Sequence, residues 1–276
     1  MTSALPAYII WDMNPDIFTI PFLNHPLRWY GILFAVGFFL GQQVMYYIYR
    51  KEGRSPGEID TLTIYSVVAT VLGARLGHVL FYDPAYYFSN PLKILATWEG
   101  GLASHGGVIG MAIALYLFAR KTNVPFLWIV DRIAIAGCLA GAAIRMGNLT
   151  NSEMVGIPTT MPWGFIFTLV DDVPRHPAQL YEALYCLALF GLLFWMWFRF
   201  RDTMRNGFIF GWFLIILFSL RFVDEFLKVN QEAFEDTMVL NMGQLLSIPL
   251  VLTGIVILIV TARQKKARAE DELKEA

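Results

Sequence analysis

Long runs of apolar residues are the feature that most limits what this 276-residue chain can fold into. A run of about 20 mostly apolar residues is long enough to cross a bilayer as a helix. The chain contains seven such runs, near residues 30–49, 61–82, 105–119, 125–146, 178–198, 207–227 and 242–262. Its hydrophobic share of 57% also exceeds that of an ordinary soluble domain. We therefore expect an all-α integral membrane protein with seven transmembrane helices.

The segments between these runs are too short for a second, soluble domain, and the sequence has neither an internal repeat nor a low-complexity stretch. We therefore predict a single polytopic membrane domain over residues 1–276. The first 18 residues lack the basic start of a removable signal peptide and contain Asp12 and Asp16. We expect these residues to form an extended or interfacial segment that leads into the first span. Residues 263–276 are expected to form a charged, helical tail.

The placement of lysine and arginine predicts the orientation, whereas the net charge of −1 says little. Alternate loops carry most of these residues: Arg50, Lys51, Arg54, Arg120, Lys121, Arg199, Arg201, Arg205, Arg263, Lys265, Lys266 and Arg268. The other loops carry mainly Lys93 and Arg175. The positive-inside rule places the first set in the cytoplasm. The N-terminus and the loops 83–104, 147–177 and 228–241 are then periplasmic, and the tail is cytoplasmic.

Most ionisable residues inside or beside the predicted spans fall at this periplasmic end. Together with the polar Asn148, they are Arg75, His78, His105, Arg145, Arg175, His176, Glu182, Arg221, Glu225 and Lys228. Arg145 and Asn148 are three residues apart and so share a helix face. Asp131 and Arg132 are exceptions, at the cytoplasmic start of the fourth span. One end of the membrane domain is therefore the candidate site.

Charged residues inside a membrane are costly and mark function by default. Several cations and an imidazole at one depth favour a cavity for an anion, and an arginine fork suits a phosphate diester such as a phospholipid headgroup. An imidazole suits proton transfer near neutral pH. Structural roles stay open: snorkelling or ion pairing between helices for the arginines, and a helix cap or a packed ring for His105.

Two other classes of function stay open on these residues. A seven-helix transporter would spread its polar residues along a whole pathway, whereas here they gather at one membrane face. Another phospholipid-dependent transferase is the nearer alternative, because it too would bind a phosphate diester. The sequence shows no CxxC, no cluster of metal ligands and no nucleotide-type glycine-rich loop, so we expect no metal, no cofactor and no nucleic-acid partner.

Six stretches together resemble the successive motifs of the bacterial prolipoprotein diacylglyceryl transferase family. They are LRWYG (27–31), WEGGLASHGG (98–107), RMGNLTNSEMVG (145–156), PRHPAQLYE (174–182), RFVDEFLK (221–228) and MGQLLSIP (242–249). They occur in the family's order, from the first predicted span to the last. The chain departs from the family pattern at four positions, Ile144, Leu149, Leu217 and Lys228.

The resemblance implies an enzyme of the bacterial inner membrane that catalyses the first step of lipoprotein maturation. Such enzymes transfer the diacylglyceryl group of phosphatidylglycerol to the lipobox cysteine of a prolipoprotein signal peptide, forming a thioether and releasing glycerol phosphate. The implied partners are these two substrates and membrane lipids. His105, Arg145 and Arg221 are the implied catalytic residues, with His105 as the base for the thiol. Substrate binding is implied for Tyr30, Gly106, Asn148, Glu153, Gly156 and Glu225.

The two cysteines of the chain, Cys138 and Cys186, both fall inside predicted spans. Cysteines in such apolar surroundings are usually buried and unreactive. We therefore expect the thiol of the reaction to come from the peptide substrate by direct displacement.

Overall fold

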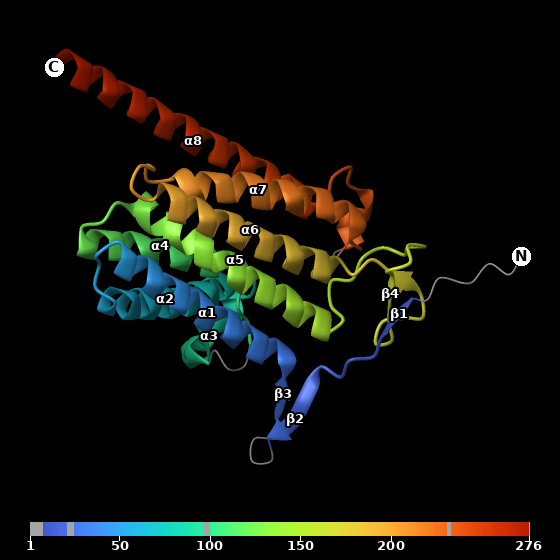
Figure 1. Ribbon diagram of the computed structural model, residues 1–276. Helices are drawn as coiled ribbons and strands as arrows, with labels where there is room; N and C mark the ends of the chain where they lie inside the picture. The colour runs from blue at the N-terminus through green and yellow to red at the C-terminus, as the bar shows by residue number, and fades with distance from the viewer. Residues whose placement is uncertain (1–7, 21–24, 97–99, 231–232, 276) are drawn as a thin grey trace, which may run out of the picture. The chain divides into compact units, whose positions relative to one another are not determined.

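The computed structural model describes residues 8–20, 25–96, 100–230 and 233–275, and it is mostly helical (Figure 1). Its α-helices are α1 (Trp29–Lys51), α2 (Gly57–Phe81), α3 (Pro84–Ser89), α4 (Ser104–Thr122), α5 (Phe126–Thr150), α6 (Ala178–Phe200), α7 (Phe208–Asp224) and α8 (Met242–Glu275). The described residues also form the short 3-10 helices η1 (Pro91–Leu95), η3 (Glu225–Leu227) and η4 (Ala233–Thr237).

Five of the helices in the described part of the chain are long and apolar enough to cross a membrane. They are α1, α2, α5, α6 and the segment Met242–Arg263 of α8. The prediction of a helical membrane protein is confirmed at this level. The remaining two predicted spans are also helices, α4 with 19 residues and α7 with 17. At about 1.5 Å of rise per residue, α7 is about 26 Å long.

The all-α expectation was incomplete, because the described residues also contain five short strands. They are β1 (Ile9–Trp11), β2 (Asp16–Ile20), β3 (His25–Arg28), β4 (Phe165–Phe167) and β5 (Pro174–Arg175). β1 pairs in parallel with β4, which pairs antiparallel with β5, and β2 and β3 form an antiparallel pair. The pairing of β2 with β3 confirms the extended lead-in. Strands of two to five residues are too short for their periodicity to be seen in the sequence.

Two of the predicted loops are partly helical in the structure. α5 continues to Thr150, so residues 147–150 are helical and not part of the predicted loop 147–177. The predicted loop 83–104 contains α3 and η1. The helical tail is confirmed, because α8 runs without interruption to Glu275.

The chain forms two compact units, and both boundaries between them fall inside helices, in α1 and α5. The first unit consists of Met1–Val44 and Ile133–Ala276, and the second of Met45–Arg132. In the first unit α6 lies beside α7, and α7 beside α8 (Figure 1). A small core of Leu149, Phe165 and Phe167 joins the end of α5 to the β1–β4–β5 sheet.

In the second unit α2 and α4 pack closely through glycines. A Cβ atom built on Gly73 would lie 2.9 Å from the Cα of Gly110, and one built on Gly77 would lie 2.9 Å from the Cα of Gly106. Small residues let two helix backbones approach this closely within a membrane. The glycines around His105 therefore position the start of α4 against α2.

Candidate active site

A chain of ion pairs connects α5, α6 and the end of α7 in the first unit. The Nε of Arg145 lies 2.9 Å from one carboxylate oxygen of Glu182, and the Nζ of Lys228 lies 3.1 Å from the other. The same Nζ lies 3.0 Å from Glu225, whose carboxylate lies 3.5 Å from the Nε of Arg221. We call Arg145, Glu182, Lys228, Glu225 and Arg221 the ion-pair chain. The two arginines selected from the sequence are its two ends.

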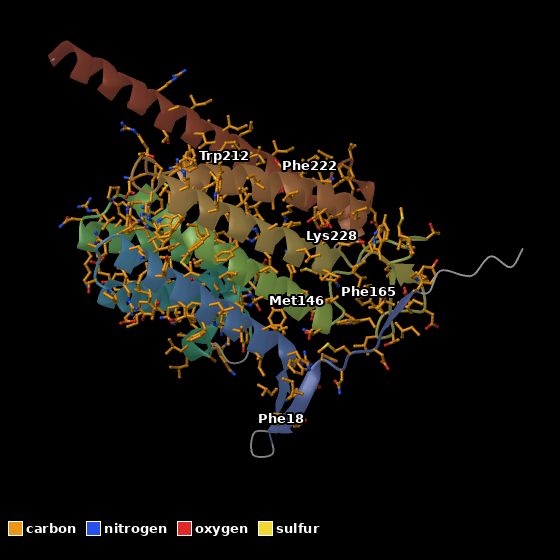
Figure 2. The ribbon with its side chains drawn as sticks, viewed as in Figure 1. Phe18, Met146, Phe165, Trp212, Phe222 and Lys228 are labelled. Carbon is orange, nitrogen blue, oxygen red and sulfur yellow. The ribbon has the colours of Figure 1, made fainter. Side chains whose placement is uncertain are left out.

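The middle of the ion-pair chain is buried and its ends are accessible. The side chains of Glu182 and Lys228 are 1% and 3% exposed, whereas those of Arg145 and Arg221 are 17% and 37% exposed. Both buried charges are paired, and Lys228 donates hydrogen bonds to Glu182 at 3.1 Å and to Glu225 at 3.0 Å, as a buried ion pair requires. Figure 2 labels Lys228 at the end of α7. The buried middle of the ion-pair chain can therefore hold both guanidinium groups in place, while their exposed parts remain available to an anion.

The site also contains acids beside its cations. Asp224 is also buried and lies 4.0 Å from Lys228. The acids contact each arginine through its Nε, which leaves the Nη nitrogens for other acceptors. Nη1 of Arg145 donates to Asn148 at 3.5 Å, as their shared helix face predicted. The carboxylates thus orient the arginines without occupying every donor.

The segment that follows α5 folds back on the helix through Glu153. Asn148 donates to one carboxylate oxygen of Glu153 at 3.2 Å, and Asn151 donates to the other at 3.1 Å. Ser152 and Met154 have φ angles of 53° and 56°, in the left-handed region that non-glycine residues avoid. Such local strain persists where surrounding contacts impose it, and it gathers at functional sites. This turn holds Asn148 and Glu153 next to Arg145.

Tyr30 and Gly156 serve the packing of this region. The Tyr30 ring lies against Gly147, where an added Cβ would come within 2.7 Å of the ring. Gly156 forms a β-bridge with Lys228, and its N–H donates to the carbonyl of His176 at 2.9 Å. An added Cβ at Gly156 would come within 2.6 Å of the Cβ of His176. Gly156 is therefore needed where the loop after α5 meets the end of α7.

The start of α8 also reaches Glu225. The side-chain amide of Asn241 donates to Glu225 at 3.1 Å, and an added Cβ on Gly243 would come within 2.5 Å of that carboxyl group. The glycine of the MGQLLSIP stretch is therefore explained by its close approach to the ion-pair chain.

The loop before α6 contains a separate pair. Arg175 and Asp171 are 2.5 Å apart, and this hydrogen bond lowers the pKa of Asp171 and raises that of Arg175. Burial lowers the pKa of His176, whose Nδ1 lies 3.1 Å from the hydroxyl of Tyr181. These residues brace the loop, and Arg175 is thus committed to Asp171 and to the carbonyl of Gly156 at 3.2 Å.

His105 and Gly106 belong to the second unit, at the start of α4. His105 is exposed and lines a largely apolar groove of about 560 Å³ between α2 and α4. The groove is lined by Gly73, Leu76, Gly77, Leu80, Phe81, Tyr82, Ala103, His105, Gly106, Ile109, Gly110 and Ile113. An imidazole at the edge of such a groove can meet both a hydrocarbon chain and a polar group.

Arg75 has a structural role in the second unit. It is buried, and its guanidinium donates to five backbone carbonyls, those of Lys93, Ile94, Ala96, Gly100 and Gly101. It also lies over the ring of Tyr87, 4.9 Å from its centroid. Arg75 therefore has a structural role and is not a cation that binds an anion.

The family is decided by comparison with known proteins. The family model for prolipoprotein diacylglyceryl transferase matches residues 15–260. The chain belongs to this family. A phosphatidylglycerol–prolipoprotein diacylglyceryl transferase of Porphyromonas gingivalis is 48% identical over 272 residues, covering 92% of this chain and 95% of the relative. Enzymes of the same name from Tolumonas auensis and Chloroherpeton thalassium are 46% and 40% identical, covering 93% and 94% of this chain and 99% and 96% of the relatives.

For this member of the diacylglyceryl transferase family, the first unit contains seven of the nine site residues predicted from the sequence. These seven are Tyr30, Arg145, Asn148, Glu153, Gly156, Arg221 and Glu225. Sequence reasoning placed Glu182 and Lys228 in the group at the periplasmic end but gave them no catalytic or binding role, although they form the centre of the ion-pair chain. The signal was available, because an acid inside an apolar run needs a cation and the neighbouring runs supply them.

Proposed function

We propose that this chain transfers the diacylglyceryl group of phosphatidylglycerol to the cysteine thiol of a prolipoprotein. Membership of the family across residues 15–260 supports the reaction. The observation in the molecule that carries it is the ion-pair chain, which ends in two accessible arginines. In the reaction a C–O bond to phosphate breaks and a C–S bond forms, glycerol phosphate leaves with the bonding electrons, and the thiol proton passes to a base.

In this proposal Arg145 and Arg221 bind the phosphate of the donor lipid. Guanidinium groups form strong, directional hydrogen bonds to phosphate oxygens. They would also neutralise the charge that grows on the departing oxygen, and fixed donors do so without reorganising during the reaction. Their ion pairs with Glu182 and Glu225 provide this fixing.

We assign the proton transfer to His105, because it is an exposed imidazole beside an apolar groove. The thiolate is the nucleophile, so removal of the proton must precede or accompany the attack. Gly106 would allow the lipid or the peptide to approach the backbone of α4. Tyr30, Asn148, Glu153 and Glu225 would orient the arginines or the glycerol hydroxyls, with Gly156 holding the loop in place.

We further propose that α4 and α7 also cross the membrane, which makes seven spans. The positions of lysine and arginine in the loops favour a periplasmic N-terminus and a cytoplasmic C-terminus. In this arrangement the protein lies in the bacterial inner membrane, and the ion-pair chain faces the periplasm. The peptide acceptor would be the lipobox cysteine of a prolipoprotein signal peptide.

A reconstitution experiment tests the function. Purified protein is incubated with phosphatidylglycerol and a lipobox peptide, and mass spectrometry is expected to show a peptide heavier by one diacylglyceryl unit. A peptide with serine in place of the cysteine should remain unmodified, because an alcohol ionises far less readily than a thiol. Absence of any modified cysteine peptide, with a folded protein, would contradict the proposed reaction.

A further inference from the structure

A second pocket lies in the first unit, at the opposite ends of α6 and α7 from the ion-pair chain. Along α6, Glu182 and Phe200 are 18 residues apart, which corresponds to about 27 Å. The pocket has a volume of about 400 Å³. Its lining includes Arg205, Phe208, Trp212, Leu258, Thr261 and Ala262. Trp212, labelled in Figure 2, belongs to α7.

The chemistry of this lining is apolar with one cation. Three aromatic rings, those of Phe200, Phe208 and Trp212, supply much of the wall. The hydroxyl of Thr261 already donates to the carbonyl of Ile257 at 2.6 Å, so it is not available as a donor to a ligand. Arg205 is then the charged group that a ligand in the pocket would meet. A ligand that fits has an apolar body and an anionic head.

Arginines are frequent in the chain segments that form this pocket. Arg199 lies in the last turn of α6, Arg201 and Arg205 lie between α6 and α7, and Arg263 follows Ala262 on α8. Asp202 is the acid between α6 and α7, and it is exposed and lies 3.7 Å from Arg201. No ion pair of Arg205 with an acid is present among the side chains that the structure describes, which on α8 end at Arg263. The local surplus of positive charge complements an anion.

We infer that this pocket binds an anionic phospholipid of the surrounding bilayer. Its acyl chain would lie against Phe208, Trp212 and Leu258, and its phosphate would meet Arg205. A lipid is favoured over a soluble anion because the walls belong to apolar helices, two of which, α6 and α8, are long enough to cross the membrane. Basic pockets between transmembrane helices are known to bind anionic headgroups.

The lipid in this pocket is bound and not consumed. Its described lining contains no histidine, cysteine, aspartate or glutamate that could act as a base or nucleophile. The distance along α6 also separates it from Glu182 by about 27 Å. The pocket is therefore a second lipid site, distinct from the proposed donor site, and its occupation can be measured without turnover.

Fluorescence quenching tests this site, because Trp212 is part of the wall. The protein is reconstituted in phosphatidylcholine vesicles that contain increasing amounts of phosphatidylserine with brominated acyl chains. The difference in quenching between the wild-type protein and Trp212→Phe is the signal from the pocket. We expect brominated phosphatidylserine to quench Trp212 at lower mole fractions than brominated phosphatidylcholine. Equal quenching by the two lipids would overturn the proposal.

Two variants test the charge of Arg205 and the space inside the pocket separately. Arg205→Gln should require about fivefold more phosphatidylserine for half-maximal quenching, as expected for the loss of one cation near a lipid surface. Ala262→Phe should fill the pocket and abolish the Trp212-dependent quenching without changing the charge. Arg120→Gln, on α4, removes the same charge elsewhere and should leave the quenching unchanged. An Arg205→Gln curve that coincides with the wild-type curve would refute the role of the cation. Both pocket variants should retain diacylglyceryl transfer.

Discussion

Replacing Glu182 by glutamine is expected to disable the site by releasing Arg145. Glu182 is buried and contacts Arg145 at 2.9 Å and Lys228 at 3.1 Å. Glutamine keeps the shape of the side chain but removes its charge, so the buried Lys228 and the partly exposed Arg145 lose a common partner. Breaking a buried ion pair in this way costs about 3–5 kcal/mol. Because Lys228 keeps Glu225 at 3.0 Å, we expect the lower end of that range.

The effect on catalysis follows from the position of Arg145. Without its partner at Nε, the guanidinium is no longer fixed against α6. Misplacement of a catalytic group by about 1 Å can reduce the rate about 100-fold. We therefore expect kcat/KM to fall about 100-fold, with most of the loss in kcat if Arg145 acts mainly on the departing phosphate. Transfer to a lipobox peptide measures both constants, and thermal unfolding in detergent measures stability.

A second substitution separates stability from activity. Lys228→Met removes a buried cation but leaves Arg145 paired with Glu182 at 2.9 Å. We expect it to lower stability, because Glu225 and Asp224 lose this cation, while kcat/KM falls less than in Glu182→Gln, because Arg145 stays anchored. A fall in kcat/KM as large as that of Glu182→Gln would refute the positioning role of Glu182. So would a folded Glu182→Gln protein with near wild-type kcat/KM.

The second unit supplies a matched control. Arg132 and Glu52 form another largely buried pair, with Nη2 and Oε1 2.8 Å apart. Glu52→Gln should lower stability by a comparable amount and leave kcat/KM of the folded protein unchanged. Loss of activity in this control would show that any buried ion pair affects turnover through stability alone.

Four further predictions address the proposed mechanism and topology. Arg145→Ala and Arg221→Ala should insert normally but lose most transfer activity, with lysine rescuing only part because a point charge replaces a fork; near-normal turnover of either alanine variant would exclude that arginine. His105→Ala should be slow at neutral pH and recover partly at higher pH, where the peptide thiol ionises by itself; loss of lipid binding without recovery would indicate a positioning role. The double variant Cys138→Ala, Cys186→Ala should stay active, since both thiols are buried and the attacking sulfur is assigned to the peptide; a folded but inactive protein would favour a covalent lipid–enzyme intermediate. Reporter fusions at Arg54, Arg120 and Arg201 should report the cytoplasm, and fusions at Lys93 and Asp172 should report the periplasm. The reverse result would contradict the proposed orientation.

The sequence by itself determined the features that depend on local composition. A long apolar run forms a helix in a membrane wherever it occurs, so the helices could be predicted from the runs alone. Spacing along a helix is also local, which is why the contact between Arg145 and Asn148 was predictable. The six motifs were sufficient to indicate the family, and its match over residues 15–260 confirmed it.

Only the tertiary structure decided which charges are partners. Glu182 and Lys228 are 46 residues apart, and neither is marked by local pattern as the partner of the other. Arg75 looked like a site cation, but the fold surrounds it with five carbonyls. The pairing of β1 with β4 joins Ile9 to Phe165, across more than half of the length of the chain. Electrostatic and hydrogen-bond partners are set by distance in space, and a sequence records only distance along the chain.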